Sequence, residues 1–126
     1  MFNSPKDDSK YQWTSHVKDK MIYYRISESL VKRIVRFPKR TEEGIALRTV
    51  AVMQTTGNRN KPQEIWVMYQ TVGSRRLEVG GWKKNLVKTQ PKFRIISAWR
   101  YPGVSPVGKP IPIPEDILQE LNALVN

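Results

Sequence analysis

The side chains that could carry chemistry in this chain are one histidine, His16, and a large excess of arginines and lysines. The sequence has no cysteine, and its carboxylates lack the spacing of a paired acid site, a magnesium site or a nucleotide-binding loop. Histidine has an unperturbed pKa of about 6.5, so His16 is the candidate general acid or base. RNA carries its own nucleophile, the 2′-hydroxyl, and its cleavage needs only proton transfers and positive charge near the phosphate. If this chain is an enzyme, we expect it to cleave RNA without a metal or other cofactor.

Three arginines complete the candidate catalytic set by offering positive charge to a phosphate: Arg48, Arg94 and Arg100. Arg94 and Arg100 share one parity of an expected strand, and Ser97 has the other. If the strand alternates strictly, both arginines should face the nucleic acid while Ser97 is buried, whereas a bulge would reassign these faces. Arg48 lies on a mixed face of an earlier expected strand, where it could anchor inward or serve the site. The alternative for His16 is an ordinary histidine on a helix surface.

The charge is unevenly distributed along the 126 residues, which include 22 Lys or Arg and 11 Asp or Glu for a formal net charge of +11. Residues 1–40 carry 10 basic and 4 acidic side chains, and residues 71–100 carry 8 and 1, whereas residues 41–70 are neutral. Such clustering is typical of a polyanion partner, because neutralising phosphates releases condensed counterions. A solubility role is the alternative. An anionic membrane is disfavoured, since neither basic segment is a sufficiently long amphipathic helix.

The expected nucleic-acid contacts are basic residues on the N-terminal helices and in a basic insertion, together with two tyrosines that could stack on bases. They are Lys20, Lys32, Arg33, Arg36, Tyr69, Lys83, Lys84, Lys88 and Tyr101. Either tyrosine could instead belong to the core, and the lysines of the insertion could simply be solvated. We expect no metal ligand among the candidates.

Two helices are the first elements that the sequence predicts. One begins at Thr14 or Ser15, where a side-chain hydroxyl can cap it, and continues with apolar residues at helical spacing. The second begins after Ser27 and ends at Phe37, because Pro38 disfavours the helical conformation for the residue before it.

The remainder of the chain predicts mainly strands. Ile45 to Gln54 and Glu64 to Val72 are rich in β-forming residues and flank turn residues, which indicates a hairpin. Residues 73–91 form the basic insertion, either a short excursion or a basic β-hairpin. Phe93 to Tyr101 predicts a third strand, and Pro114 opens a C-terminal helix.

These elements predict an α+β fold, in which the N-terminal helices and the C-terminal helix cover one face of a twisted antiparallel sheet of about four strands. We expect a single domain over residues 13–126, preceded by a flexible tail at residues 1–12. The 39% apolar residues can supply one core. No apolar run could span a bilayer or serve as a signal peptide, so we expect a soluble cytoplasmic protein.

Short motifs in this sequence resemble a known toxin superfamily. The run Phe93-Arg94-Ile95-Ile96-Ser97-Ala98-Trp99-Arg100 resembles the last core strand of the BrnT-type toxins, within the broad RelE-like ribonuclease fold. The front half is similar to a related family of small toxin-like domains through His16, Met21, Arg25-Ile26-Ser27, Val31, Ile34 and Pro38. The resemblance covers residues 16–101 and implies a helical layer on a twisted antiparallel sheet whose exposed face binds RNA.

Three hypotheses for function follow. The first is a toxin-like, metal-independent endoribonuclease that uses His16 as acid or base and arginines to stabilise phosphate charge. The second is a nucleic-acid-binding module without catalytic activity. The third is a protein-interaction module whose basic surface docks an acidic antitoxin-like partner. All three imply a polyanionic or acidic partner, and none requires a membrane or a small-molecule cofactor.

Overall fold

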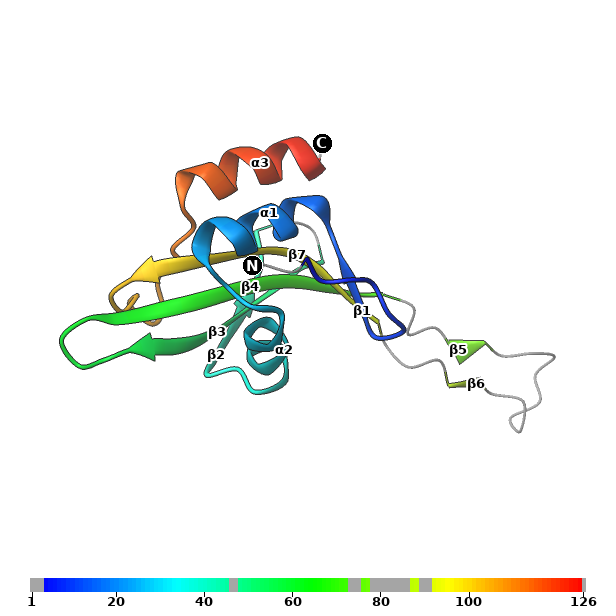
Figure 1. The fold of residues 1–126 in the computed structure, drawn as a ribbon, viewed down its shortest axis with the longest axis horizontal. Helices are drawn as coiled ribbons and strands as arrows, with labels where there is room; N and C mark the ends of the chain where they lie inside the picture. The colour runs from blue at the N-terminus through cyan, green and yellow to red at the C-terminus, as the bar shows by residue number, and fades with distance from the viewer. Residues whose placement is uncertain (1–3, 46–47, 73–75, 78–86, 89–91, 126) are drawn as a thin grey trace.

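A computed structural model of the chain describes residues 4–45, 48–72, 76–77, 87–88 and 92–125 (Figure 1). The strands of the main sheet are β1 (Tyr11–Trp13), β2 (Arg40–Glu43), β3 (Val50–Gly57), β4 (Pro62–Val72) and β7 (Lys92–Pro102). A separate pair consists of β5 (Arg76–Leu77) and β6 (Val87–Lys88). The helices are α1 (Ser15–Tyr24), α2 (Glu28–Arg36) and α3 (Glu115–Val125). The α+β class predicted from the sequence is confirmed.

The main sheet has five strands in the order β1-β7-β4-β3-β2. Neighbouring strands are antiparallel except β1, which runs parallel to β7. The hairpin predicted around the Gly57 turn is confirmed as β3 and β4. The expected antiparallel sheet of about four strands is wrong, because β1 and β2 extend it on either side. These edge strands have only 3 and 4 residues, too short to give a clear pattern in the sequence.

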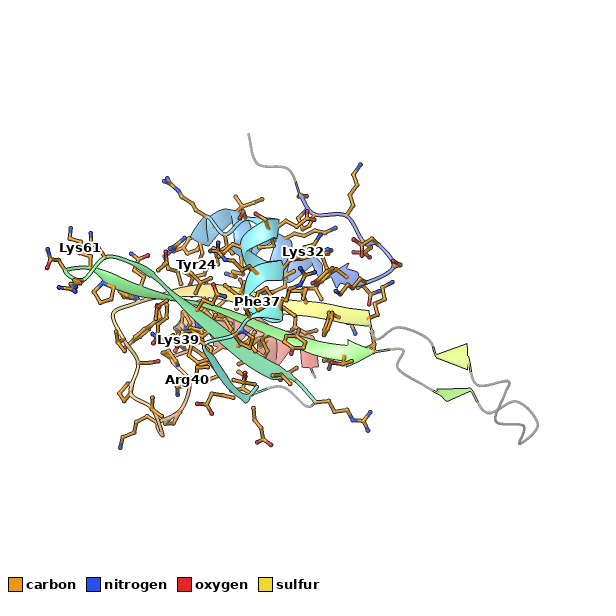
Figure 2. The ribbon with its side chains drawn as sticks, turned by 90° about the horizontal axis from the view of Figure 1, so that it is seen from below. Tyr24, Lys32, Phe37, Lys39, Arg40 and Lys61 are labelled. Atoms are coloured by element: carbon orange, nitrogen blue, oxygen red, sulfur yellow. The ribbon has the colours of Figure 1, made fainter. Side chains whose placement is uncertain are left out.

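The helices do not all cover one face of the sheet, as the sequence analysis expected. In Figure 2, α2 lies in front of the sheet, α3 lies behind it, and α1 lies beside β7. Hydrogen bonds hold α1 against β7: Thr14 Oγ1 donates to the Ile96 carbonyl over 2.9 Å, and Arg100 Nε donates to the Tyr24 carbonyl over 3.1 Å. The sheet is therefore covered on both faces, and α1 covers the edge of β7 beyond β1.

The apolar composition of β4 explains this arrangement. Four consecutive residues, Ile65–Met68, are all fully buried. Because successive side chains of a strand point to opposite faces, such a run needs apolar cover on both sides. Ile65 and Val67 belong to the cluster packed under α2, and Trp66 and Met68 belong to the cluster packed under α3.

The predicted starts and ends of α1 and α2 are confirmed. Thr14 caps α1 by accepting from the Val17 amide, and Ser27 caps α2 by accepting from the Leu30 amide. α1 ends at Arg25 in the left-handed conformation with φ 57°, and α2 ends at Phe37, before the proline. Within the described part of the chain, no helix is long and apolar enough to cross a membrane.

A β-bulge in β7 changes which side chains share a face. The register between β4 and β7 shifts at the Met68–Tyr69 step of β4. Ile95, before the bulge, and Ala98, after it, both pack in the cluster under α2, although they are an odd number of residues apart. Trp99 packs in the cluster under α3. Strict alternation along this strand therefore fails between Ile95 and Ala98.

The bulge corrects the expectation that Arg94 and Arg100 face the same side. Arg94 precedes Ile95 and so points to the α3 side, whereas Arg100 follows Ala98 by two positions and points to the α2 side. Ser97 is fully buried, as predicted.

Arg48 does not lie in a strand, as the sequence analysis expected. The expected strand at Ile45 to Gln54 begins only at Val50, and Arg48 is an exposed residue of the β2–β3 turn with φ 61°. The turn closes through the Gly44 amide, which donates to the Thr49 carbonyl over 2.9 Å. A β-carbon at Gly44 would clash with the Thr49 side chain, so this close approach requires glycine.

The expected N-terminal tail is partly built into the fold. Tyr11 and Gln12, which the sequence analysis assigned to the tail, are the first residues of β1, and Pro5 is buried. Asp8 accepts from the Tyr11 amide over 2.7 Å, and Asp7 accepts from the Trp13 amide over 2.9 Å. These carboxylates fix the turn that brings β1 alongside β7.

A buried carboxyl group holds the proline-rich segment that leads to α3. Both oxygens of Glu64, a fully buried residue, accept hydrogen bonds from Ser105, whose amide lies 3.0 Å and whose Oγ lies 2.6 Å away. Trp66 Nε1 donates to the same carboxyl group over 3.0 Å. Further along, Trp99 Nε1 donates to the Pro112 carbonyl over 2.8 Å. These bonds direct residues 103–114 across the sheet so that α3 reaches the face opposite α2.

Candidate functional site

The candidate acid or base, His16, lies in the first turn of α1, between β7 and α3. Its Nε2 lies 2.8 Å from Ser97 Oγ, and its Nδ1 lies 2.9 Å from Glu120 Oε2 on α3. The bond from Thr14 to the Ile96 carbonyl fixes the start of α1 directly beside this part of β7. His16 is therefore held from both sides and is itself buried.

The surroundings of His16 favour its neutral form. Burial lowers the pKa of His16 below its usual value, and the nearby Glu120 carboxylate opposes this shift without reversing it. In the neutral tautomer that satisfies both neighbours, Nδ1–H donates to Glu120 and Nε2 accepts from the Ser97 hydroxyl.

The side chains of Ser97, His16 and Glu120 contact one another in the same order as the nucleophile, the base and the acid of a serine hydrolase. A relay needs a nucleophile that a substrate can reach, however, and Ser97 has no exposed surface. The cluster therefore joins α1, β7 and α3 rather than presenting a hydroxyl group to solvent.

One turn further along α1, Lys20 extends the same contact between α1 and α3. Its Nζ lies 2.8 Å from Asp116 Oδ2 and 3.0 Å from Glu120 Oε2. Burial lowers the pKa of Lys20, but its bonds to the two carboxylates outweigh burial and leave the pKa raised. Tyr24 Oη donates to Asp116 over 3.1 Å. We call these residues the α1–α3 seam: His16, Lys20, Tyr24, Asp116 and Glu120.

The seam corrects the expected role of Lys20 as a nucleic-acid contact. Lys20 is buried and paired with two carboxylates, so binding a phosphate would require it to leave both. The sequence analysis could not foresee this pairing, because the acidic residues of α3 are about a hundred positions away from Lys20 in the chain.

Arg100 is also engaged within the fold. Its guanidinium donates to the carbonyls of Tyr24 and Arg25, both over 3.1 Å, and to Gln63 Oε1 over 2.8 Å. These two carbonyls belong to the C-terminal end of α1, where a helix leaves carbonyl groups without helical partners. Arg100 therefore caps α1, and no phosphate contact is needed to explain its position.

The four candidate catalytic residues are not brought together. His16 and Arg100 contact opposite ends of α1, eight residues apart, which corresponds to about 12 Å along a helix. Arg94 is exposed and points to the other face of the sheet from Arg100. Arg48 lies in the β2–β3 turn, with β4 and β3 between it and β7.

Both candidate tyrosines lie partly in the core. Tyr69 is half-buried and packs edge to face against Phe93, with ring centroids 5.4 Å apart, and burial raises its pKa. Tyr101 is half-buried against the cluster under α3. Lys83 and Lys84 lie outside the described residues, and Lys88 is the last residue of β6.

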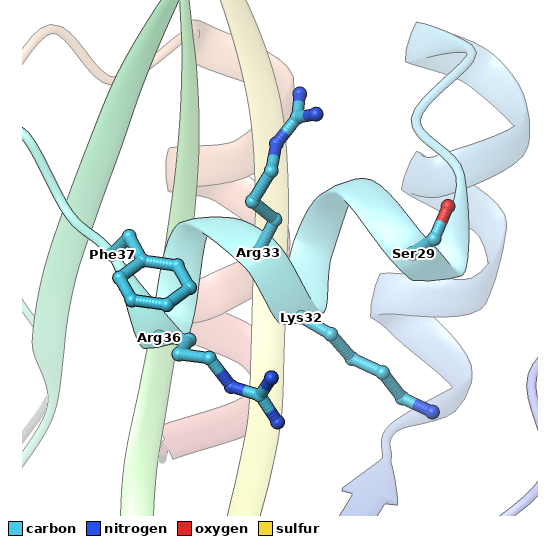
Figure 3. Close-up of a pocket in the computed structure, with 5 residues that line it drawn as sticks. All are labelled: Ser29, Lys32, Arg33, Arg36 and Phe37. Carbon is cyan, nitrogen blue, oxygen red and sulfur yellow. The ribbon is translucent and has the colours of Figure 1, made fainter.

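The outer face of α2 carries the basic residues that the helical pattern predicted there. Val31, Ile34 and Val35 turn inward and are buried, which leaves Lys32, Arg33 and Arg36 outside. These three cations, with Ser29 and Phe37, line an open hollow of about 260 Å³ (Figure 3). We call this surface the α2 hollow.

The arginines of the α2 hollow are free to bind an anion. Lys32 Nζ lies 2.8 Å from Glu28 Oε2, and this hydrogen bond is the main cause of its raised pKa. The same Nζ lies over the ring of Tyr11. Arg33 and Arg36 are exposed and form no ion pair with any residue that the structure describes.

Phe37 is a residue of the hollow that the sequence analysis did not single out. It was interpreted only as the end of α2, yet 64% of its surface is exposed. The sequence could have revealed this exposure, because Phe37 lies four positions after Arg33. Residues at this spacing lie on the same face of a helix, so Phe37 shares the basic face of α2. Beyond it, Lys39 is exposed, whereas Arg40 is half-buried and bonded to Glu42 and Ser105 (Figure 2).

Among the residues that the structure describes, no group of three or more His, Cys, Asp or Glu side chains is arranged to hold a metal ion. The polar groups of the seam are paired with one another and with Ser97 of β7. The two candidate regions therefore differ: the seam is internally satisfied, and the α2 hollow offers unpaired positive charge to solvent.

The seam predicts how stability depends on pH. Because the pKa of His16 is lowered in the folded state, the unfolded chain takes up a proton more readily as the pH falls below about 6.5. Protonation of His16 therefore destabilises the fold, and stability should fall between pH 7 and pH 5.5. Urea unfolding measured at both pH values should show a smaller loss for His16→Gln than for the unmodified chain. An equal loss in the two proteins would contradict the assignment of a neutral, buried His16.

Comparison of the chain with protein-family models, with curated proteins and with solved structures found no match. The resemblance to BrnT-type toxins consequently stays a prediction, and the case for function rests on the geometry of the α2 hollow and of the α1–α3 seam.

Proposed function

We propose that this protein binds RNA through the outer face of α2. The observation that carries the proposal is the pair of exposed, unpaired arginines, Arg33 and Arg36, beside Lys32 on the rim of one hollow. Guanidinium groups in this state bind phosphate without first breaking an internal ion pair.

The charge of the whole chain supports the same partner. A net charge of +11 on 126 residues attracts a polyanion over long range, and α2 presents part of that charge on one exposed face. Lys39, three residues beyond the end of α2, is also exposed. Such a surface favours binding to a phosphate backbone before any base is recognised.

The ribonuclease hypothesis has less support than binding alone. It requires an acid or base and a phosphate-stabilising arginine at one position, but His16 is held in the seam and Arg100 caps the other end of α1. Binding at the α2 hollow requires neither residue. We therefore favour a nucleic-acid-binding module without catalytic activity.

Removal of the two unpaired arginines should weaken RNA binding strongly. For Arg33→Ala/Arg36→Ala we expect at least a tenfold rise in Kd for a fluorescently labelled RNA, measured by anisotropy. The slope of log K against log salt should become shallower by about 1.4, because each lost contact with a single strand removes about 0.7. Neither arginine packs in the core, so urea unfolding should be unchanged.

The matched control is Lys6→Ala/Lys109→Ala, which removes two exposed positive charges outside the α2 hollow. We expect less than a threefold change in Kd for this variant. Equal weakening by both double variants would mean that net charge alone governs binding, and the α2 face would lose its assigned role.

The non-catalytic assignment predicts that purified protein leaves RNA intact. Labelled RNA incubated with the protein in EDTA should give no more product than RNA incubated with His16→Ala, as judged on a denaturing gel. Cleavage that disappears in the His16→Ala variant would restore the ribonuclease hypothesis and place His16 in its mechanism.

A further inference from the structure

We propose that the α2 hollow selects single-stranded RNA over duplex RNA, with Phe37 as a stacking platform for one unpaired base and with Arg33 and Arg36 as contacts for phosphates of the same strand. This inference rests on the proposed function and names the form of RNA that the same face takes. It depends on the exposure, the anchoring and the neighbours of Phe37.

The exposure of the ring points to a ligand with an aromatic face. Phe37 leaves 64% of its surface in water, although Ile34 and Val35, three and two positions earlier, are buried under the helix. A single exposed apolar side chain is common on protein surfaces. Here, however, the ring lines the same hollow as Arg33 and Arg36, which gives it a role that a solitary exposed ring lacks.

The backbone that carries the ring is held in place before any ligand arrives. The Phe37 amide donates to the Arg33 carbonyl over 2.8 Å. Gln54 on β3 reaches across and donates from Nε2 to the Phe37 carbonyl over 2.6 Å. Pro38 also restricts the backbone conformation of Phe37, the residue before it. An anchored platform loses less conformational freedom on binding than a mobile one.

The cations and the platform line one hollow on α2. Figure 3 shows the Phe37 ring at the C-terminal end of the stripe, with the side chains of Arg33 and Arg36 extending in different directions from the helix. The hollow of about 260 Å³ is somewhat smaller than a typical small-molecule pocket of about 300 to 1,000 Å³.

The combination of a ring with cations discriminates between single strands and duplexes. In a duplex the faces of the bases are stacked on one another and cannot meet a side-chain ring, whereas unpaired bases can stack on aromatic side chains. A surface with cations alone would bind a duplex at least as tightly as a single strand, because the duplex has the higher charge density. Tighter binding of the single strand than of the duplex therefore measures how much Phe37 contributes to RNA affinity.

The test compares one RNA oligonucleotide with its own duplex at equal salt. We expect the unmodified protein to bind the single strand at least about fivefold more tightly than the duplex, measured by anisotropy. Phe37→Leu should weaken single-strand binding by at least about fivefold and change duplex binding by less than twofold. Phe37→Trp, which keeps an aromatic face, should retain the preference.

The matched control is Tyr23→Leu, which removes an aromatic side chain that is 72% exposed on α1 and does not line the hollow. It should leave both affinities unchanged. Equal binding of strand and duplex, or equal weakening of both by Phe37→Leu, would overturn the stacking platform while leaving RNA binding by α2 intact. Failure of the unmodified protein to bind either RNA would overturn the proposed function and the platform together.

Discussion

Burial of both faces of the central strands is the constraint on which the rest of this structure depends. The run Ile65–Met68 in β4 is apolar at every position, and the bulge in β7 lets that strand fit the same two-sided core. One helix cannot cover two faces, so α2 and α3 take one each, and α1 closes the edge of β7. The buried bonds from Glu64 to Ser105 carry the chain across the sheet to make this possible.

This arrangement decides which basic residues remain available to a partner. Because α3 lies on the face opposite α2, its carboxylates Asp116 and Glu120 meet α1 and pair with Lys20 and His16. Among the described residues, the carboxylate that forms an ion pair with α2 is Glu28 of the same helix, which pairs with Lys32, and Asp8 adds a weaker attraction to the same lysine. The carboxylates of α3 therefore pair with α1 and not with α2, and they leave Arg33 and Arg36 on the outer face of α2 without an ion pair among the described residues.

Local patterns allowed much of the fold to be predicted from the sequence. The capping hydroxyls, the Phe37-Pro38 stop and the apolar periodicity correctly located α1 and α2, and turn residues located the β3–β4 hairpin. Long-range features could not be predicted in this way. Three of these features depend on contacts between distant segments. A bulge places Arg94 and Arg100 on opposite faces of the sheet, and a turn that requires glycine places Arg48 outside a strand. The third feature is the pairing of Lys20 with α3. The basic face of α2 was predictable because it follows from helical spacing alone.

The location of the RNA contact is the central claim, and chemical-shift mapping tests it most directly. Amide spectra of isotope-labelled protein recorded during addition of single-stranded RNA should change first at Ser29, Lys32, Arg33, Arg36 and Phe37, which line the hollow. Amides near His16 and Ser97 should move little, because the seam stays closed. Changes centred on His16 and Ser97, with α2 unaffected, would contradict this account and favour the ribonuclease hypothesis in which His16 is the acid or base.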